Sequence, residues 1–172
     1  MNNPMRVILM GLLAVSMAAC TKKVKEEVPP PADTTPPPTA TTESVDDGKY
    51  GPPDLDSDSC LRQRVVYFDF DQADIKSDAA AILACHGKYL SDVPGSKMTL
   101  GGHADERGSR EYNIGLGERR GNAVSSALQA NGGSSAQITV NSYGEERPTC
   151  SESDESCWGK NRRVEIVYTQ AQ

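Results

Sequence analysis

The chain has 172 residues, enough for one ordinary domain with additional segments. Only 37% of the residues are hydrophobic and the mean hydropathy is −0.54, so part of the chain lacks the apolar side chains needed for a core. The net charge is −6 and there is no basic stripe interleaved with aromatic residues. Nucleic acid is therefore not expected as a partner, because its phosphates would be repelled.

The N-terminal segment has the features of a secretory signal. Arg6 precedes an apolar run over residues 7–19, which is too short to span a bilayer comfortably and ends in two alanines. Cys20 follows directly, in a pattern that resembles the lipobox of bacterial lipoproteins, although Met17 stands where leucine is usual. We therefore expect residues 1–19 to be a lipoprotein signal peptide. The alternative is an ordinary signal followed by a free thiol.

Lipidation of Cys20 would anchor the protein stably, because several acyl chains on one residue hold a membrane better than a single chain does. The next residue is Thr21, rather than the aspartate that marks retention at the inner membrane in many Gram-negative lipoproteins. We therefore expect the protein to be lipid-anchored in the outer membrane, with its domain facing the periplasm.

Four cysteines remain if Cys20 carries lipid, an even number that suits an oxidising compartment. Of the three possible pairings we favour Cys150–Cys157, which closes a short acidic loop, and therefore Cys60–Cys85. Each bridge would contribute roughly 2–3.5 kcal/mol by restricting the unfolded chain. The alternative is a zinc site that uses His86 beside Cys85, but its spacing fits no paired-ligand pattern.

Residues 20–58 are expected to form the lipidated cysteine and a tether. Eight of the eleven prolines lie there among Thr, Asp, Glu and Lys, a composition that favours extended polyproline II. At about 3.1 Å per residue, the upper reach of such a tether is on the order of 100 Å. The folded domain is then expected over residues 59–172.

From residue 59 onward, strand and helix patterns alternate. Helices are predicted from a cap at Ser77 to about Leu90, and from about Arg110 to Ala130, where Asn-Gly-Gly follows. β-branched and aromatic residues predict four strands, over 64–70, 97–104, 137–143 and 163–169. The order β-α-β-α-β-β predicts an α+β fold, a two-layer sandwich with the helices on one face of a mixed four-stranded sheet.

One charged residue of the longer helix lies on its apolar face. At 100° per residue, Leu116, Ala123 and Ala127 form the buried stripe, with Arg120 in its middle and Asn113 close beside it. Burying an unpaired guanidinium costs several kcal/mol, so we expect an anionic group to meet Arg120. That group is either an internal carboxylate or a ligand.

Asp105 is the natural partner, since it follows the second strand, and strand ends are common ligand sites in α/β sheets. In contact, Asp105 and Arg120 would form a structural ion pair. Slightly further apart they would clamp a zwitterion, with Asp105 binding its ammonium and Arg120 its carboxylate. The free end of diaminopimelate in a wall peptide is such a zwitterion.

Several separated motifs resemble the OmpA-like peptidoglycan-binding domain. The resemblance covers residues 60–169, and the motifs occur in the right order: YFDFD at 67–71, GHADERGS at 102–109, YN at 112–113, LGERR at 116–120, AV at 123–124, SYGE at 142–145 and NRRV at 161–164. Gly121 departs from the alanine that usually follows the arginine, which should weaken the helix by somewhat under 1 kcal/mol.

The resemblance implies the site residues and the partners. By it, Asp105 and Arg120 bind diaminopimelate, Asn113 and Leu116 line the same pocket, and Phe70-Asp71 flanks it. Lipidated members of the family join the Tol system and bind TolB through a surface that overlaps the wall site. The implied partners are peptidoglycan, TolB with the inner-membrane Tol complex, and outer-membrane lipid. The implied role is to anchor that membrane to the wall, in envelope integrity and in constriction during cell division, without a cofactor or a metal.

The main alternative is an enzyme that acts on the wall, which would need a positioned nucleophile or a metal. Ser134 and Ser135 lie outside any nucleophile-elbow pattern, and there is no His-Glu-x-x-His helix. His103 fits a turn-supporting role better than that of a base. We therefore expect a binding module and not an enzyme. A further alternative is an OmpA-like lipoprotein of another envelope machine, which would share the pocket but not bind TolB.

Overall fold

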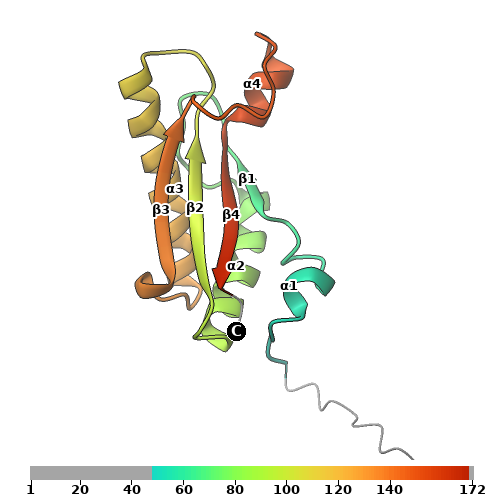
Figure 1. Cartoon of the computed structure of the whole chain (residues 1–172). Helices are drawn as coiled ribbons and strands as arrows, with labels where there is room; N and C mark the ends of the chain where they lie inside the picture. The colour runs from blue at the N-terminus through green and yellow to red at the C-terminus, as the bar shows by residue number, and fades with distance from the viewer. Residues whose placement is uncertain (1–47, 171–172) are drawn as a thin grey trace, which may run out of the picture. The chain divides into compact units, whose positions relative to one another are not determined.

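In the computed structural model, which describes residues 48–170, a four-stranded sheet carries helices α2 and α3 on one face (Figure 1). The strand order is β1-β4-β2-β3. β2 and β3 run parallel, while β4 is antiparallel to both of its neighbours, β1 and β2. The predicted α+β sandwich with a mixed sheet is confirmed. The strands are β1 (Val65–Tyr67), β2 (Lys97–His103), β3 (Ile138–Gly144) and β4 (Arg163–Gln170).

The longest helix, α3 (Arg110–Ala130), has the bounds that the sequence predicts, and the Ser109 side chain caps it by accepting a hydrogen bond from Tyr112 N. α2 (Ser77–Asp92) is capped differently from the prediction. Lys76 occupies the extended N-cap position and Ser77 is already helical, so Ser77 is not the cap. The remaining helices are α1 (Asp54–Ser57), α4 (Glu155–Asn161) and the 3-10 turn η1 (Ser135–Gln137), none of which was predicted.

The folded part includes residues 50–58, which the sequence assigned to the tether. Leu55 is buried in a small cluster with Leu61, Tyr89 and Val93. Tyr50 N donates a hydrogen bond to the Asp92 carboxylate at 2.9 Å. The segment folds onto the domain because Tyr50 and Leu55 give it apolar surface to bury, and because the chain turns after Pro52-Pro53.

The predicted signal peptide, Cys20 and the tether up to residue 47 lie outside the described residues. Within residues 48–170, none of the helices combines the length and hydropathy that crossing a bilayer requires.

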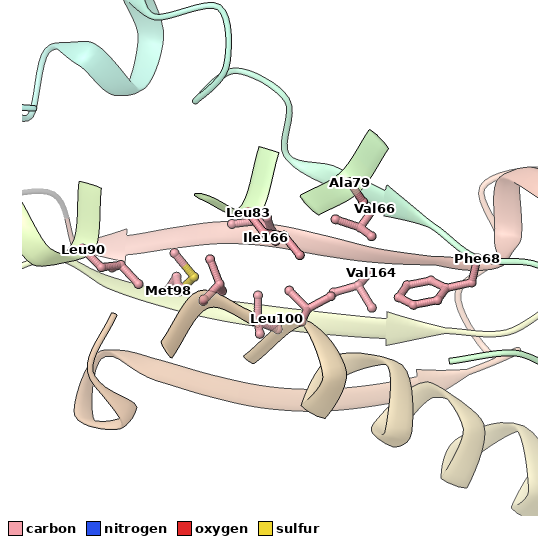
Figure 2. Packing of buried hydrophobic residues seen from close by; sticks show 11 residues of the cluster. Val66, Phe68, Ala79, Leu83, Leu90, Met98, Leu100, Val164 and Ile166 are labelled. Carbon is pink, nitrogen blue, oxygen red and sulfur yellow. The ribbon is translucent and has the colours of Figure 1, made fainter. Parts of the chain in front are cut away.

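The main core lies between the sheet and the two long helices (Figure 2). Alternate residues of the central strands face it, as predicted, because successive side chains of a strand point to opposite faces. Eleven buried apolar side chains form this core: Val66, Phe68, Ala79, Leu83, Leu90, Met98, Leu100, Val124, Leu128, Val164 and Ile166.

Glycines let α3 lie directly against the sheet. A Cβ on Gly102 would come within 2.0 Å of the Gly117 carbonyl oxygen, so only glycine fits where β2 meets the helix. A Cβ on Gly121 would lie 2.5 Å from Val140 Cγ1 of β3. Gly121 therefore lets α3 pack close to β3, a benefit that its low helix propensity alone does not indicate. From the next turn of α3, the side chain of Arg120 reaches the carbonyl oxygen of His103 at the end of β2.

The cysteines form the two favoured bridges. Cys60–Cys85 joins the segment before β1 to α2, and Cys150–Cys157 closes the loop that contains the start of α4. The two ring nitrogens of His86 lie 2.8 Å from Tyr168 Oη and 3.0 Å from the Gln63 carbonyl oxygen. Both ligands of the zinc alternative are thus engaged elsewhere, and no cluster of metal-binding side chains occurs in the described part of the chain.

Candidate functional site: a charged pocket at the end of β2

A cavity of about 200 Å³ lies where β2 ends, between the start of α3 and the turn that follows β1. All six residues proposed for the site line it, so Asp105 and Arg120, the two residues expected to clamp the ligand, share one cavity. The full lining is Phe70, Asp71, Asp105, Arg107, Gly108, Tyr112, Asn113, Leu116 and Arg120. Three of these, Arg107, Gly108 and Tyr112, belong to the recognised motifs but had no role assigned.

Arg120 is fully buried, and its partners are backbone carbonyl oxygens. Nε donates to Gln72 O at 2.8 Å, Nη1 to His103 O at 2.8 Å, and Nη2 to Asp69 O at 3.0 Å. The ion pairs of residues 48–170 do not include Arg120, so of the two expected alternatives the internal carboxylate is absent from this part of the chain and the ligand remains a prediction. Three carbonyl dipoles solvate the charge instead.

Arg120 remains positively charged although it is buried. Burial lowers the pKa of Arg120 to about 10, and the negative charge of Asp105 opposes that shift. The side chain is therefore protonated at neutral pH. Its three hydrogen bonds use three of five N–H donors, which leaves one donor on each terminal nitrogen. Two donors on one planar guanidinium can bind the two oxygens of a carboxylate.

The turn that follows β1 presents Phe70 and Asp71 to the pocket. Arg120 fastens this turn on both sides, through the carbonyl groups of Asp69 and Gln72. Asp71 has φ of 57°, a left-handed conformation that Asp and Asn tolerate better than most residues. The Asp71 carboxylate accepts a hydrogen bond from the Tyr112 hydroxyl through Oδ1. Phe70 is 54% exposed at the mouth.

Asp105 is nearly buried and has four hydrogen bonds of its own. Oδ1 accepts from Arg107 N and Nε, each at 3.1 Å, and Oδ2 accepts from Arg107 Nη2 at 2.7 Å and Arg162 Nη1 at 3.2 Å. Burial alone would raise the pKa of Asp105, but these hydrogen bonds from the two arginines hold it below its ordinary value. Asp105 and Arg120 thus share one cavity while each has other partners.

The loop between β2 and α3 is held by Asn113. Its side-chain nitrogen donates to Asp105 O at 3.1 Å and Arg107 O at 3.3 Å, and also to the Glu145 carboxylate. Gly108, with φ of 117°, makes the turn into the helix that an L side chain would strain. Asn113 therefore acts on the pocket through the loop, whereas Leu116 provides part of its apolar wall.

Sequence reasoning missed Arg107, which forms one side of the cavity. Its guanidinium carbon lies 4.0 Å from the Phe70 ring centre and 4.1 Å from that of Trp158. The two rings come from segments 88 residues apart (158 − 70), so no local pattern could pair them. The presence of the only tryptophan of the chain near a recognised motif was the one available signal.

The arrangement suits a small ligand that carries both charges. Arg120 offers two N–H donors at the base, Asp71 offers a carboxylate at the mouth, and Phe70 and Leu116 supply apolar walls. The lining holds neither a serine nor a cysteine that could act as a nucleophile. The pocket thus presents groups of both charges beside apolar walls.

Comparison with known proteins identifies the family. The model of the OmpA family matches residues 67–162, more than half of the chain. The chain belongs to the OmpA family. This is a family of non-catalytic peptidoglycan-binding domains, so the alternative of a wall-acting enzyme is excluded.

The relatives include several bacterial lipoproteins. A peptidoglycan-associated lipoprotein from Pseudomonas putida is 45% identical over 113 residues, which are 65% of this chain and 68% of that protein. One from Pasteurella multocida is 40% identical over 121 residues, or 70% of this chain and 78% of the relative. One from Mesorhizobium japonicum is 34% identical over 170 residues, or 99% of this chain and 94% of the relative. The resemblance stated from the motifs is confirmed.

Solved structures agree with the OmpA-like fold. The crystal structure of the peptidoglycan-associated lipoprotein from Burkholderia pseudomallei superposes with a TM-score of 0.65 at 40% identity, covering 67% of this chain and 98% of that one. The C-terminal domain of Helicobacter pylori MotB shares the fold alone, with a TM-score of 0.57 at 21% identity over 62% of this chain and 84% of the MotB domain.

Proposed function

We propose that this protein is an outer-membrane lipoprotein whose OmpA-family domain binds the diaminopimelate-containing peptide of peptidoglycan and thereby anchors the membrane to the wall. One observation carries the proposal. Arg120 is a buried, charged guanidinium with two N–H donors left over, in a cavity that carboxylates also line. A buried cation with unused donors is suited to an anionic ligand group.

In the proposed complex, the carboxylate at the free end of diaminopimelate accepts hydrogen bonds from the two remaining donors of Arg120. The ammonium on the same carbon faces Asp71 and Asp105. Asp71 keeps Oδ2 for this contact, because the Tyr112 hydroxyl uses Oδ1. A direct bond to Asp105 requires the Arg107 guanidinium to give up one of its positions on that carboxylate.

The proposed binding mode also predicts a preference among wall peptides. The methylene groups of diaminopimelate would lie against Phe70 and Leu116, which are the apolar part of the lining. Lysine in the same position lacks the second carboxylate. It would leave the donors of Arg120 without an acceptor in a desolvated site, and buried polar groups without partners are costly.

The setting of this activity is also proposed. The similarity to proteins named peptidoglycan-associated lipoprotein supports four further proposals. These are lipidation of Cys20, export to the outer membrane, TolB and the Tol complex as partners, and a part in envelope integrity and cell division. The Mesorhizobium japonicum relative supports the N-terminal features in particular, since its match covers 99% of this chain. Capture of TolB by the purified protein would separate a Tol partner from another envelope machine.

Co-sedimentation with purified wall sacculi tests the binding. We expect the wild-type protein to sediment with sacculi that contain diaminopimelate, to release no soluble muropeptides, and to sediment poorly with sacculi that contain lysine. Arg120→Lys keeps the charge but loses the planar pair of donors, and should sediment poorly. Arg62→Lys, at an exposed position that does not line the pocket, is the matched control and should behave as wild type. Equal sedimentation with both kinds of wall would contradict the proposal.

A further inference from the structure

The guanidinium of Arg107 is held by groups from three separate segments. The rings of Phe70 and Trp158 cover it at 4.0 and 4.1 Å, and Asp105 accepts two hydrogen bonds from its edge. Glu155 approaches the same Nη2 atom at 3.7 Å. A planar guanidinium stacks on aromatic faces in a way that an ammonium does not, so this arrangement fixes the orientation of Arg107 as well as its charge.

Two of these groups belong to α4. Trp158 donates from Nε1 to Glu106 at 3.0 Å, which fixes the indole, and Glu155 accepts a hydrogen bond from Arg162, the second arginine on Asp105. α4 therefore contacts the pocket only indirectly, through the side chains of Arg107 and Arg162. The helix thus positions Arg107, which forms one side of the cavity, without lining the cavity itself.

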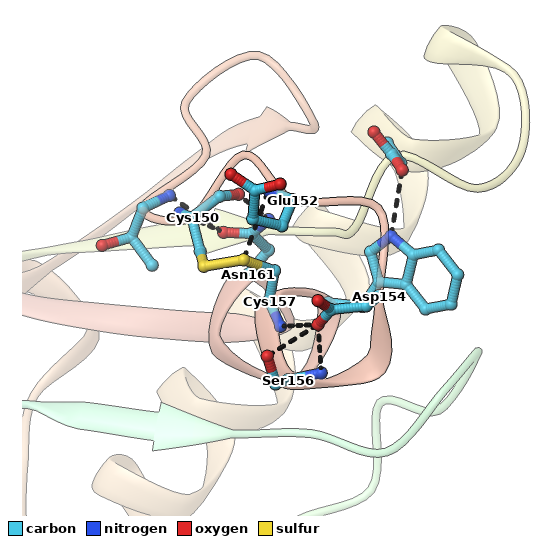
Figure 3. The surroundings of a disulfide bond; sticks show 9 residues. Cys150, Glu152, Asp154, Ser156, Cys157 and Asn161 are labelled. Atoms are coloured by element: carbon cyan, nitrogen blue, oxygen red, sulfur yellow. Dashed lines mark hydrogen bonds between the residues drawn. A yellow bond between two sulfur atoms is a disulfide. The ribbon is translucent and has the colours of Figure 1, made fainter.

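A helix of seven residues has little stability of its own. Over residues 145–160, the only buried residue is Cys157, which is 1% exposed. Figure 3 shows what holds the segment: the Cys150–Cys157 bridge, the cap formed by Asp154, and Asn161, whose side chain bonds Cys150. The bridge therefore closes a loop within the segment and restrains the start of α4, together with the contacts of Trp158 and Glu155.

We propose that Trp158 and Glu155 are positioning residues for the pocket, which fix Arg107, and that the Cys150–Cys157 bridge is needed for them to do so. This inference rests on the proposed function. Without the bridge, α4 loosens, Arg107 loses one aromatic face and Glu155, and the wall peptide must then order that side chain as it binds. Immobilising one long side chain on binding lowers affinity about three- to tenfold.

Calorimetric titration of the full chain in detergent micelles with a muramyl tripeptide that ends in diaminopimelate tests this. We expect Cys150→Ser/Cys157→Ser and Trp158→Ala to bind about three- to tenfold more weakly than wild type. Trp158→Phe keeps an aromatic face and should bind within about twofold of wild type. Cys60→Ser/Cys85→Ser removes the other bridge, far from the pocket, and is the matched control, also expected within about twofold.

Because Trp158 is the only tryptophan of the chain, its fluorescence reports directly on this contact. Its emission should shift to the red in Cys150→Ser/Cys157→Ser, but not in Cys60→Ser/Cys85→Ser. Wild-type affinity in Cys150→Ser/Cys157→Ser would overturn the inference, as would equal losses from the two bridges or a Trp158→Phe variant as weak as Trp158→Ala. Failure of the wild-type protein to bind the tripeptide would instead contradict the proposed function. If Trp158→Ala does not fold, the comparison of the two bridges decides.

Discussion

The exposed carboxylate of Asp71 allows the charge of the pocket to be changed without disturbing the fold. Asp71→Asn keeps an oxygen for the Tyr112 hydroxyl and suits the left-handed φ of 57°, so we expect the free energy of unfolding to change by less than about 0.5 kcal/mol. Binding should respond strongly, because the variant loses a charge-assisted hydrogen bond to the ligand ammonium. Such bonds contribute about 1.5–3 kcal/mol, which corresponds to a roughly 10- to 150-fold loss of affinity for the wall peptide.

The matched control is Asp69→Asn, which removes the same charge two residues away. Asp69 pairs with Lys76 on the surface and does not line the cavity, so its variant should bind within about twofold of wild type. Calorimetric titration with the diaminopimelate tripeptide measures both affinities, and urea unfolding measures both stabilities. If Asp71→Asn binds as tightly as Asp69→Asn, Asp71 does not face the ammonium and the orientation of the ligand proposed here is wrong.

Three further predictions concern stability. Arg120→Ala should lower the free energy of unfolding by about 3–5 kcal/mol, because three carbonyl groups lose their donor. Arg119→Ala should change it by less than about 0.5 kcal/mol. A small effect of Arg120→Ala in urea unfolding would contradict the structural role of its hydrogen bonds. Burial lowers the pKa of His103 to about 4, so between pH 6.5 and 4 this histidine binds a proton in the unfolded chain but not in the folded one. As the pH is lowered through this range, His103 should reduce the free energy of unfolding by about 1.4 kcal/mol per pH unit. A His103→Gln variant that shows the same slope would refute this. Gly121→Ala should lower the free energy of unfolding by about 1–3 kcal/mol through overpacking against Val140, and the better helix propensity of alanine should return about 1 kcal/mol of this. A double-mutant cycle with Val140→Ala should show a coupling energy of about 1 kcal/mol. Additive effects of the two substitutions would show that the contact relaxes without cost.

Local patterns predicted most of the fold. The end of α3 follows from Asn-Gly-Gly, and the strands follow from alternation and β-branched residues. The cap of α2 was misassigned because Lys76 and Ser77 are adjacent and only the backbone angles decide between them. α4 escaped prediction because a short helix inside an acidic, glycine-containing loop depends on its cap and on a disulfide, and not on periodicity.

The site shows the same division between local and distant information. Arg120 was identified from its place on the apolar face of a helix and Asp105 from its place at a strand end, and the motifs supplied the roles of Asn113, Leu116 and Phe70-Asp71. The partners of Arg120 could not be predicted, because they are backbone carbonyl groups, two of them in a turn about 50 residues earlier in the chain and the third at His103. Arg107 was missed for a related reason, since the two rings around it come from opposite ends of the domain sequence.

The attachment of residues 50–58 determines how the domain would bear mechanical load. Tyr50 bonds Asp92, just before β2 begins, whereas the pocket lies where β2 ends, about 20 Å away along the strand (Figure 1). A pull between the N-terminal segment and a ligand in the pocket therefore runs roughly parallel to the strands. Because this segment enters the sheet through β1, the ladders of β4 with β1 and β2 are then loaded in shear, so that many hydrogen bonds resist together rather than opening one after another.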